Sequence, residues 1–516
     1  MKNNDSIKPK KILIVGAGIS GLSAGIHALL SGYDATILEK NPVSGGLCTG
    51  WYRKGRYIDG CIHWLTGTKE GTILNDTWKL LGAFDSQDDI INLPSWGSFN
   101  YDGTTITFWA DTKKAEQEWL NVSPIDKRQI KKFFRLVNSF SKVELPLDKP
   151  ISWHTPYQLF MLIMRMIKIG PSYLTSMLIS REKYAKRFKN PAIRFALNNI
   201  QPGSSNLYSM LYGYSNIVTG NGGIIKGGSM QFTKNMENKF VNLGGQIKFN
   251  KCVDEILIED GKAIGVKLTN GEIIKSDYII SCVDGYHALN KLLKNQYPIK
   301  LLEKRQKYPE YYDSPTCVYI SLLVDDELKD MNVPTTINCE PFNVGLRTFS
   351  YLTMRPYTYQ KNLYTKDGKT LMTIILEQSG KDYDYWKWLN TNKEKYNKQK
   401  EEIANKVIEI IYDKYPNLKD KITLLDVATP ITYERYVNAY RGSYMGYLIR
   451  PGGHMFVHNG NVGLKNFYLS GQWVQDPGGL PIAATNGKFA VLRILRKDKG
   501  LSIYNLKLNN YIGKMS

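Results

Sequence analysis

The feature that most constrains this chain of 516 residues is a glycine-rich turn near its beginning. An apolar run at residues 11–15 is followed by Gly16, Gly18 and Gly21, in the spacing G-x-G-x-x-G, and then by an apolar helical pattern. The first glycine permits a sharp turn, the second lets a pyrophosphate approach the backbone, and the third lets helix and strand pack closely. A second predicted strand ends in Glu39, whose carboxylate can accept hydrogen bonds from a ribose. The pattern predicts an α/β unit with a dinucleotide site.

The composition is that of a globular protein long enough for two or three domains. Hydrophobic residues make up 42% of the chain and charged residues 22%. Residues 1–10 are polar, which predicts that no secretory signal is present. The six cysteines form no C-x-x-C pair, so we expect reduced thiols and a cytoplasmic location.

The net charge of +21 calls for an anionic partner. No helix-turn-helix, zinc-finger or RNA-binding motif accompanies it, so we expect no nucleic acid and favour an anionic membrane surface. An apolar run at residues 157–169 is too short and too charged to span a bilayer, and is typical of a helix lying in the interface or at the mouth of an apolar pocket. A buried cap-domain helix is the alternative. The window 151–200 contains one acid, Glu182, and eight basic residues: Arg165, Lys168, Arg181, Lys183, Lys186, Arg187, Lys189 and Arg194.

Further elements follow from periodicity and turn residues. Residues 99–109 alternate around an Asp-Gly turn and predict a hairpin, and turns at 260–261 and 270–271 predict two more. A helix is expected after Ser123, and residues up to about 214 read as helices with a break at 170–171. The expected buried positions of the helix after Ser123 are Ile130, Phe133, Phe134, Val137 and Phe140. The other expected elements are strands at 246–250, 253–258, 263–268, 278–282, 317–324, 370–376 and 467–471, and helices at 392–412 and 482–495.

Two further glycine clusters distinguish FAD from NAD as the dinucleotide. Gly45 and Gly46 follow Glu39 closely, where backbone amides can meet the cofactor again. Near the end of the chain, Gly471 and the pair at 478–479 precede a helix, whose positive end suits the flavin ring.

These patches together resemble the phytoene desaturase family, which includes carotenoid isomerases and retinol saturases, within the amine-oxidase-like FAD superfamily. The resemblance implies an α/β fold with a discontinuous Rossmann-type FAD-binding domain, a mixed-sheet substrate domain and a helical cap. The patches that carry it are residues 16–46, 57–60, 226–230, 243–246, 253–284, 429–435, 442–446 and 471–488. The expected domains are 1–120 (FAD-binding, with a hairpin insertion), 121–215 (helical cap), 216–300 (FAD-binding), 301–455 (substrate sheet and helix) and 456–516 (FAD-binding).

The resemblance also implies which residues hold FAD. This chain departs from the family at Gln472, where relatives usually carry an acid, and at Cys61, where they usually carry glycine. The implied pyrophosphate residues are Gly16, Ala17, Gly18, Ser20 and Gly21, with Glu39 and Lys40 at the ribose and Val253 at the adenine. The implied flavin residues are Gly46, Leu47, Gly471, Gly479, Leu480 and Pro481.

His63 is the sharpest candidate for a catalytic side chain, because imidazole can give or take a proton near neutral pH. A structural histidine bonded to a carbonyl is the alternative reading. Asp476 and Tyr444 are weaker candidates of the same kind. No metal-ligand cluster is visible, and no second G-x-G-x-x-G motif occurs, so a resident NAD(P) domain is not expected.

The resulting expectation is an FAD-dependent oxidoreductase acting on carbon–carbon bonds of a long apolar substrate, by desaturation, saturation or flavin-dependent isomerisation. An isoprenoid or polyene is the leading substrate class and an unsaturated fatty acyl chain comes second, with quinone or oxygen as electron acceptor. The alternatives are an amine-oxidase-like enzyme on a polar substrate and a non-catalytic flavin-bound membrane protein. Fold alone does not separate them.

Overall fold

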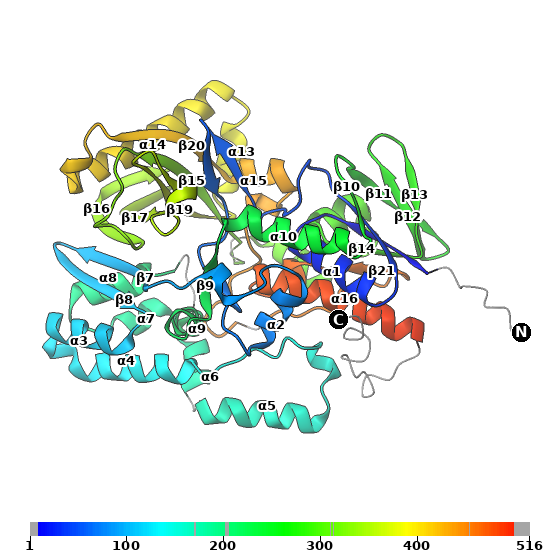
Figure 1. Ribbon diagram of the computed structural model, residues 1–516, viewed down its shortest axis with the longest axis horizontal. Helices are drawn as coiled ribbons and strands as arrows, with labels where there is room; N and C mark the ends of the chain where they lie inside the picture. The colour runs from blue at the N-terminus through cyan, green and yellow to red at the C-terminus, as the bar shows by residue number, and fades with distance from the viewer. Residues whose placement is uncertain are drawn as a thin grey trace, which may run out of the picture.

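Two large sheets, three smaller sheets and a layer of helices make up the described part of the protein (Figure 1). The computed structural model describes residues 9–169, 172–201, 206–309, 311–312, 314–453 and 455–499, with only the backbone described for residues 165–169 and 172. The terminal part of the last expected domain, residues 500–516, lies outside the described residues.

The first sheet is parallel and is assembled from three distant parts of the chain. Strand β1 pairs with β2 and β14, β10 pairs with β2, and β21 pairs with β14. Within the described residues its order is β10 (Gln246–Lys248), β2 (Asp34–Leu38), β1 (Lys11–Val15), β14 (Tyr278–Ser281) and β21 (Phe467–Leu469). Strands before residue 40, between residues 246 and 281 and near residue 468 thus form one sheet.

Three helices pack beside this sheet: α1 (Ile19–Leu30), α10 (Gly228–Asn242) and α16 (Leu480–Lys499). Helix α1 contacts both of the others, and it lies between strands β1 and β2 in the chain. Small residues allow this close packing, because a Cβ atom at Gly25 would lie only 2.5 Å from the ring of Phe240. A separate antiparallel sheet at the right of Figure 1 contains β11 (Val253–Glu259), β12 (Lys262–Leu268) and β13 (Ile273–Lys275).

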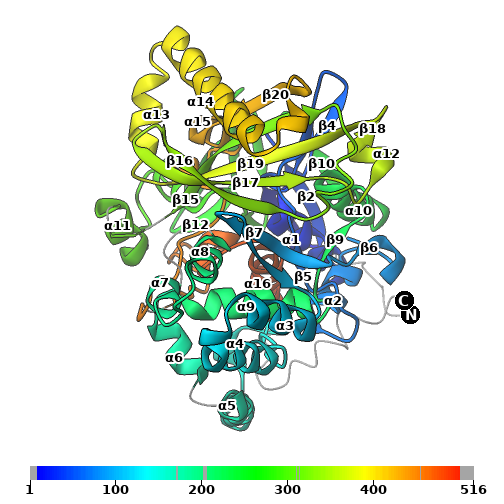
Figure 2. The ribbon, with the colours of Figure 1, turned by 90° about the vertical axis from the view of Figure 1, so that its left-hand side faces the viewer.

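The second sheet is mixed and lies to the left of the nucleotide sheet in Figure 1, so that it is the nearer of the two in Figure 2. Its one face packs on helix α14, in a core that includes Ile320, Leu352, Ile374 and Ile403. In the described chain its order is β20 (Ile422–Ala428), β15 (Pro315–Val324), β19 (Lys369–Ser379), β17 (Arg347–Pro356), β16 (Thr335–Val344), β7 (Ser95–Tyr101) and β8 (Thr104–Trp109), with β18 (Thr365–Lys366) against β19. The helices around it are α12 (Lys361–Tyr364), α13 (Tyr383–Leu389), α14 (Lys393–Lys414) and α15 (Pro430–Val437). Helix α11 (Lys300–Lys307) instead buries Leu302 in a core shared with β1, β14 and β21.

The hairpin β7–β8 is present as expected, but it belongs to the second sheet. Residues 335–337 of β16 pair in parallel with residues 98–100 of β7. The hairpin expected as an insertion within residues 1–120 is therefore present, and its partner strand lies in the second sheet. A pairing between strands separated by more than two hundred residues leaves no local signal in the sequence.

Helices cover the side of the molecule opposite α14, and α5 is the outermost of them (Figures 1 and 2). Helix α4 buries all five positions expected from its periodicity. The expected break at residues 170–171 lies outside the described residues. The helices are α2 (Ile73–Leu80), α3 (Thr112–Val122), α4 (Lys127–Phe140), α5 (Pro156–Ile169), α6 (Ser172–Leu178), α7 (Arg181–Ala185), α8 (Pro191–Asn199) and α9 (Leu207–Val218).

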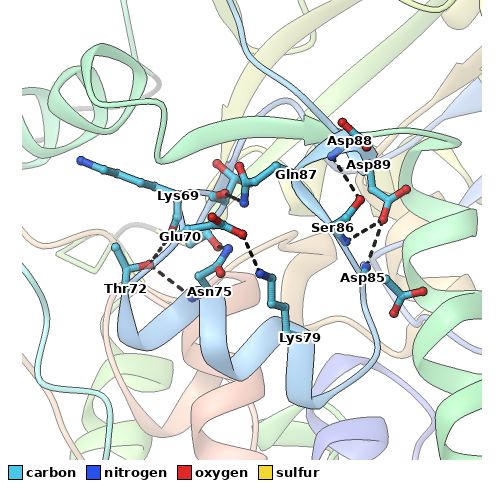
Figure 3. Close-up of polar contacts among 12 residues, drawn as sticks. Lys69, Glu70, Thr72, Asn75, Lys79, Asp85, Ser86, Gln87, Asp88 and Asp89 are labelled. Carbon is cyan, nitrogen blue, oxygen red and sulfur yellow. Dashed lines mark hydrogen bonds and ion pairs between the residues drawn. The ribbon is translucent and has the colours of Figure 1, made fainter.

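Short strands connect these layers. Strand β9 (Gly222–Ile225) pairs with β5 (Leu65–Thr66) and β6 (Ile90–Ile91), and β3 (Gly50–Arg53) pairs with β4 (Arg56–Asp59). Side chains fix the segment between β5 and β6 (Figure 3). Thr72 caps α2 by accepting from the Asn75 amide, and Lys79 forms an ion pair with Glu70 at 2.9 Å. No helix among the described residues is long and apolar enough to cross a membrane.

Candidate active site

A large cavity extends from the glycine turn after β1 to the inner face of the second sheet. Its volume is about 1240 Å³, and most of the surface that lines it is apolar. One end is formed by the turns after β1 and β2, and the far walls by residues of β15, β17 and β19 and by aromatic side chains such as Trp96 and Tyr208. The cavity can therefore hold an extended cofactor together with an apolar molecule.

The glycine turn has the close packing that a pyrophosphate site requires. A Cβ atom at Gly21 would lie 1.9 Å from the carbonyl oxygen of Gly16, so only glycine fits there. Gly18 forms a parallel bridge with Gly45, and the Gly45 amide donates to the carbonyl of Ala17 at 2.8 Å. The two glycine clusters that are separate in sequence thus form one cradle beside the N-terminus of α1. The amides of the first helical turn have no partners within the helix, so they are available to phosphate.

Glu39 directly follows β2, lines the cavity and holds the cradle in shape. Its carboxylate accepts from the amides of Ala17 and Asn41, both at 2.8 Å. Lys40 also lines the cavity, but its ammonium donates to the side chain of Asn438 at 2.9 Å and to the carbonyl of Arg435 at 3.2 Å. The ammonium of Lys40 is directed to the end of α15. Only the aliphatic part of the Lys40 side chain is therefore placed to contact the ribose, as the resemblance implied.

The other implied nucleotide residues lie at the same end. Ser20, in the first turn of α1, shares a hydrogen bond of 2.8 Å with the hydroxyl of Ser470. Val253 begins β11 and lines the cavity beside Cys252. Gly46 and Leu47 also line it, next to Gly18.

The C-terminal glycines provide an open surface for a planar ring. Gly471 and Gly479 have φ values of 114° and 87°, and a Cβ atom at either would meet nothing within 4 Å. Both line the cavity together with Leu480 and Pro481, at the N-terminus of α16. Gln472 accepts from the Gly479 amide at 3.4 Å, so this side chain braces the turn. The residues present fit FAD, with its pyrophosphate at α1 and its ring system at α16.

His63 lies in the wall of the cavity, between β4 and β5. Burial lowers the pKa of its imidazole well below the usual 6.5, and the charge of Arg355 lowers it further. Its Nε2 atom is buried and has no hydrogen-bond partner among the described residues. Both effects favour the neutral form of the ring in this cavity. A catalytic role for His63 stays a prediction.

Tyr444 faces the cavity and is engaged by an acid. Its hydroxyl donates to the carboxylate of Glu377 at 3.0 and 2.9 Å. Burial raises the pKa of the Tyr444 hydroxyl well above 10, and the Glu377 carboxylate raises it further. Tyr444 is therefore a hydrogen-bond donor that keeps its proton.

Asp476 is held in a buried ion pair. Its two oxygens accept from the guanidinium of Arg305 at 2.8 and 2.7 Å, and one also accepts from the Phe456 amide at 3.0 Å. This geometry favours a structural role at the turn before Gly478. The expected proton-transfer role stays a prediction that these contacts do not favour.

The polar residues on the inner face of the second sheet were not predicted from the sequence. Arg355 in β17 and Glu377 in β19 both line the cavity, although their strands are otherwise mainly apolar there. The signal in the sequence was a charged side chain within a strand that is otherwise buried. Burying a charge costs free energy unless the charge has a partner or a function.

The parallel nucleotide sheet, the cradle and the apolar cavity define a flavin-dependent oxidoreductase. Residues 19–495 match the family described as flavin containing amine oxidoreductase, and the chain belongs to this family. It is an enzyme, and its cofactor is FAD.

Several relatives agree with this assignment and with the resemblance seen in the sequence. Prolycopene isomerase, chloroplastic, of Daucus carota is 26% identical over 463 residues, covering 84% of this chain and 71% of its own. All-trans-retinol 13,14-reductase of Danio rerio is 22% identical, covering 89% of this chain and 82% of its own. An oxidoreductase of Methanosarcina mazei has the same fold, with a TM-score of 0.55, 16% identity, and coverage of 94% of this chain and 100% of its own.

Proposed function

We propose that the protein is an FAD-dependent oxidoreductase that acts on carbon–carbon bonds of a long apolar substrate, by desaturation, saturation or isomerisation. The observation that carries this proposal is the continuity of one mainly apolar cavity from the glycine cradle to the second sheet. Bound FAD supplies hydride chemistry at its ring, so a substrate carbon must reach that ring through the cavity. Relatives named for prolycopene and for retinol support an isoprenoid or polyene as the leading substrate class, with a fatty acyl chain second.

The side chains of the cavity have defined tasks under this proposal. Trp96, Tyr208 and Ile375 exclude water and hold an apolar chain. The ring of His63 is neutral, and its buried Nε2 atom has no hydrogen-bond partner among the described residues, so His63 is the candidate to accept a proton from a carbon next to the reacting one. Tyr444 keeps its proton and donates to Glu377, which fixes this wall of the cavity.

We also propose that helix α5 rests on an anionic membrane. Its exposed apolar side chains include Tyr157, Phe160 and Ile163, which are 70%, 56% and 54% exposed. The segment just before it, residues 145–152, lines the cavity, so the apolar face continues to the proposed substrate site. Exposed cations on α7 and just after it, together with the net charge of +21, favour an anionic lipid surface over a neutral one. Residues Arg165 and Lys168, which contributed to this expectation, have no described side chains.

The test of the reaction is anaerobic turnover of the holoenzyme with separate classes of substrate. Polyene hydrocarbons, retinoids, unsaturated fatty acids and primary amines are each mixed with oxidised and with reduced enzyme. Bleaching or recovery of flavin absorbance is followed, and products are analysed by mass for a change of two hydrogens and by chromatography for isomers. Quinone and oxygen are then compared as electron acceptors.

Turnover of a long apolar substrate without amine oxidation supports the proposal. Turnover of amines alone would assign the enzyme to polar substrates. An absence of turnover in both redox states, with FAD bound, would contradict the proposal and favour a non-catalytic flavoprotein.

A further inference from the structure

The inner face of the second sheet carries an arginine that points into the cavity. Along β17, Tyr351, Thr353 and Arg355 line the cavity, whereas the alternate residues Leu352 and Met354 are buried in the core beneath α14. This alternation follows from the pleat of a strand. The Arg355 side chain therefore faces the space that holds the substrate.

The acid on the neighbouring strand is too far along to neutralise this arginine directly. Arg355 is opposite Thr373 in β19, and Glu377 follows four residues later, about 13 Å along the strand. Glu377 instead accepts from Tyr444. Within the part of the chain that the structure describes, Arg355 makes no hydrogen bond or ion pair.

The other carboxylates of the cavity wall are also engaged elsewhere. Glu39 accepts from two backbone amides of the cradle, and Asp476 is bonded to Arg305. Asp284 accepts from the amides of Tyr286, His287 and Tyr440. Asp59, which lies on β4 just before the wall residue Gly60 and is not itself in the wall, accepts from Ser229, Tyr364 and the Cys61 amide. No protein carboxylate in the described wall is thus left to pair with Arg355.

The other cations of the wall differ from Arg355, because each has a partner. Lys40 donates to Asn438, Lys149 donates to Gln158, and Lys251 forms an ion pair with Glu272. The guanidinium of Arg493 lies 5.9 Å from the ring centre of Phe489. Among described residues, Arg355 alone in this wall has neither an oxygen partner nor an aromatic ring.

A guanidinium stays protonated, so Arg355 cannot relieve its position by losing charge. A partly buried charge in an apolar cavity is costly without a counter-ion, and a guanidinium binds carboxylates through two parallel hydrogen bonds. We propose that Arg355 binds the carboxylate of the substrate, which is then a long-chain unsaturated or polyenoic acid. This proposal rests on the proposed function, which supplies the long apolar part of the substrate. It adds that one end of the substrate carries a carboxylate.

Anchoring one end of the chain has a consequence for the reaction. With the carboxylate held at Arg355, the distance from this wall to the flavin end of the cavity determines which carbon–carbon bond reacts. Arg355 is accordingly a specificity-determining residue, which acts through binding and register.

The test measures binding to the oxidised holoenzyme without turnover. Oleate, methyl oleate and dodecyl phosphate are titrated at pH 8, below their aggregation limits, with flavin absorbance and tryptophan fluorescence as readouts. Wild type is compared with Arg355→Gln and Arg355→Lys. Arg493→Gln is the matched control within the cavity, and Arg53→Gln is the control on the surface, where that arginine is half exposed and pairs with Asp426.

We expect wild type to bind oleate at least about tenfold more tightly than its ester, the scale of a charge-assisted hydrogen bond. This ratio falls to about one in Arg355→Gln, is partly kept in Arg355→Lys and is unchanged in both controls. Equal binding of acid and ester by wild type, a ratio that persists in Arg355→Gln, or a ratio lost in Arg493→Gln would overturn the proposal. Much tighter binding of dodecyl phosphate than of oleate would overturn the choice of a carboxylate.

The outcome is separable from that of the proposed function. Acid-selective binding without any turnover would leave this inference standing while the proposed reaction fails. Turnover of uncharged polyenes by an enzyme that does not distinguish acid from ester would do the reverse.

Discussion

At the scale of single residues, the ion pair of Arg305 and Asp476 connects helix α11 to the turn at the flavin end of the cavity. The guanidinium lies among the rings of Tyr312, Tyr447 and Phe456, at 4.6 to 5.5 Å from their centres. Both charged side chains are only 6% exposed. An arrangement so fully enclosed stabilises one conformation of the turn that leads to Gly478.

Removing one partner of this pair leaves the other as an uncompensated buried charge. We expect Arg305→Met to lower the free energy of unfolding by about 3–5 kcal/mol and to weaken FAD retention. Urea unfolding of the holoenzyme and gel filtration followed by flavin absorbance measure the two effects. The double variant Arg305→Met with Asp476→Leu should recover a large part of the loss, and an unchanged single variant would contradict the structural role.

The neutral ring of His63 leads to a prediction about pH. If this side chain moves a proton, His63→Ala should keep FAD but lower turnover by about 10²–10⁴-fold. Because the pKa of His63 lies well below 6.5, turnover of wild type should show no inflection from this group between pH 6 and 9. The matched control is His154→Ala, which changes a histidine near Asp148 and outside the cavity wall. Loss of FAD together with activity would make His63 structural.

The sequence predicted residues whose role depends on neighbours in the chain. Gly21 and Glu39 could be placed because the motif that contains them is local, and the structure puts both in the cradle. Arg355 could not be placed, because its role depends on which face of β17 meets the cavity and on where every nearby acid is bonded. Such facts come only from tertiary contacts.

At the scale of elements, the same contrast holds between α4 and the hairpin β7–β8. The buried stripe of α4 was predicted correctly because helical periodicity reports burial directly. The hairpin was also predicted, but its pairing with β16 was not, since the partner strand lies far along the chain.

Helix α5 provides a test of membrane docking. We expect the protein to co-sediment with vesicles rich in phosphatidylglycerol and to be released by salt. The double variant Phe160→Ser and Ile163→Ser should bind at least about tenfold less, because each removed side chain is worth about 1.5–3 kcal/mol when fully buried. Leu346→Ser is the control, since Leu346 is 68% exposed in the turn between β16 and β17.

The vesicle experiment separates the contributions of charge and apolar surface. Equal binding to neutral and anionic vesicles would remove the electrostatic part of the proposal. No binding to either kind would contradict membrane docking and leave the function of the exposed residues of α5 unexplained.

At the scale of the whole molecule, buried histidines make stability depend on pH. Burial lowers the pKa of His27 to about 3 and that of His287 to about 4, and it also lowers the pKa values of His63 and His458. Below about pH 6.5 the unfolded chain therefore binds protons that the folded protein does not. Burial raises the pKa of Asp284 to about 6, and this one group acts in the opposite direction between pH 6 and about 4.

We expect the free energy of unfolding to fall as pH falls from 6.5 toward 4. Each such histidine contributes about 1.4 kcal/mol per pH unit once its unfolded form is protonated. His27→Leu should reduce the slope by about this amount, because His27 lies fully buried in α1. Urea unfolding at pH 7.5, 6.5 and 5.5 measures it, and an unchanged slope in the variant would contradict the assignment.

The three-part nucleotide sheet determines when in its biogenesis this protein can acquire its cofactor. While the ribosome is still adding residues up to 467, β14 exposes the edge that β21 later covers, and Gly471 and Gly479 have not been made. Early domains of many chains fold during synthesis, but here the first Rossmann segment must wait for the last. FAD capture therefore has to wait until Gly471 and Gly479 have been made, and until then β14 has an open edge that a chaperone or a second nascent chain can pair with.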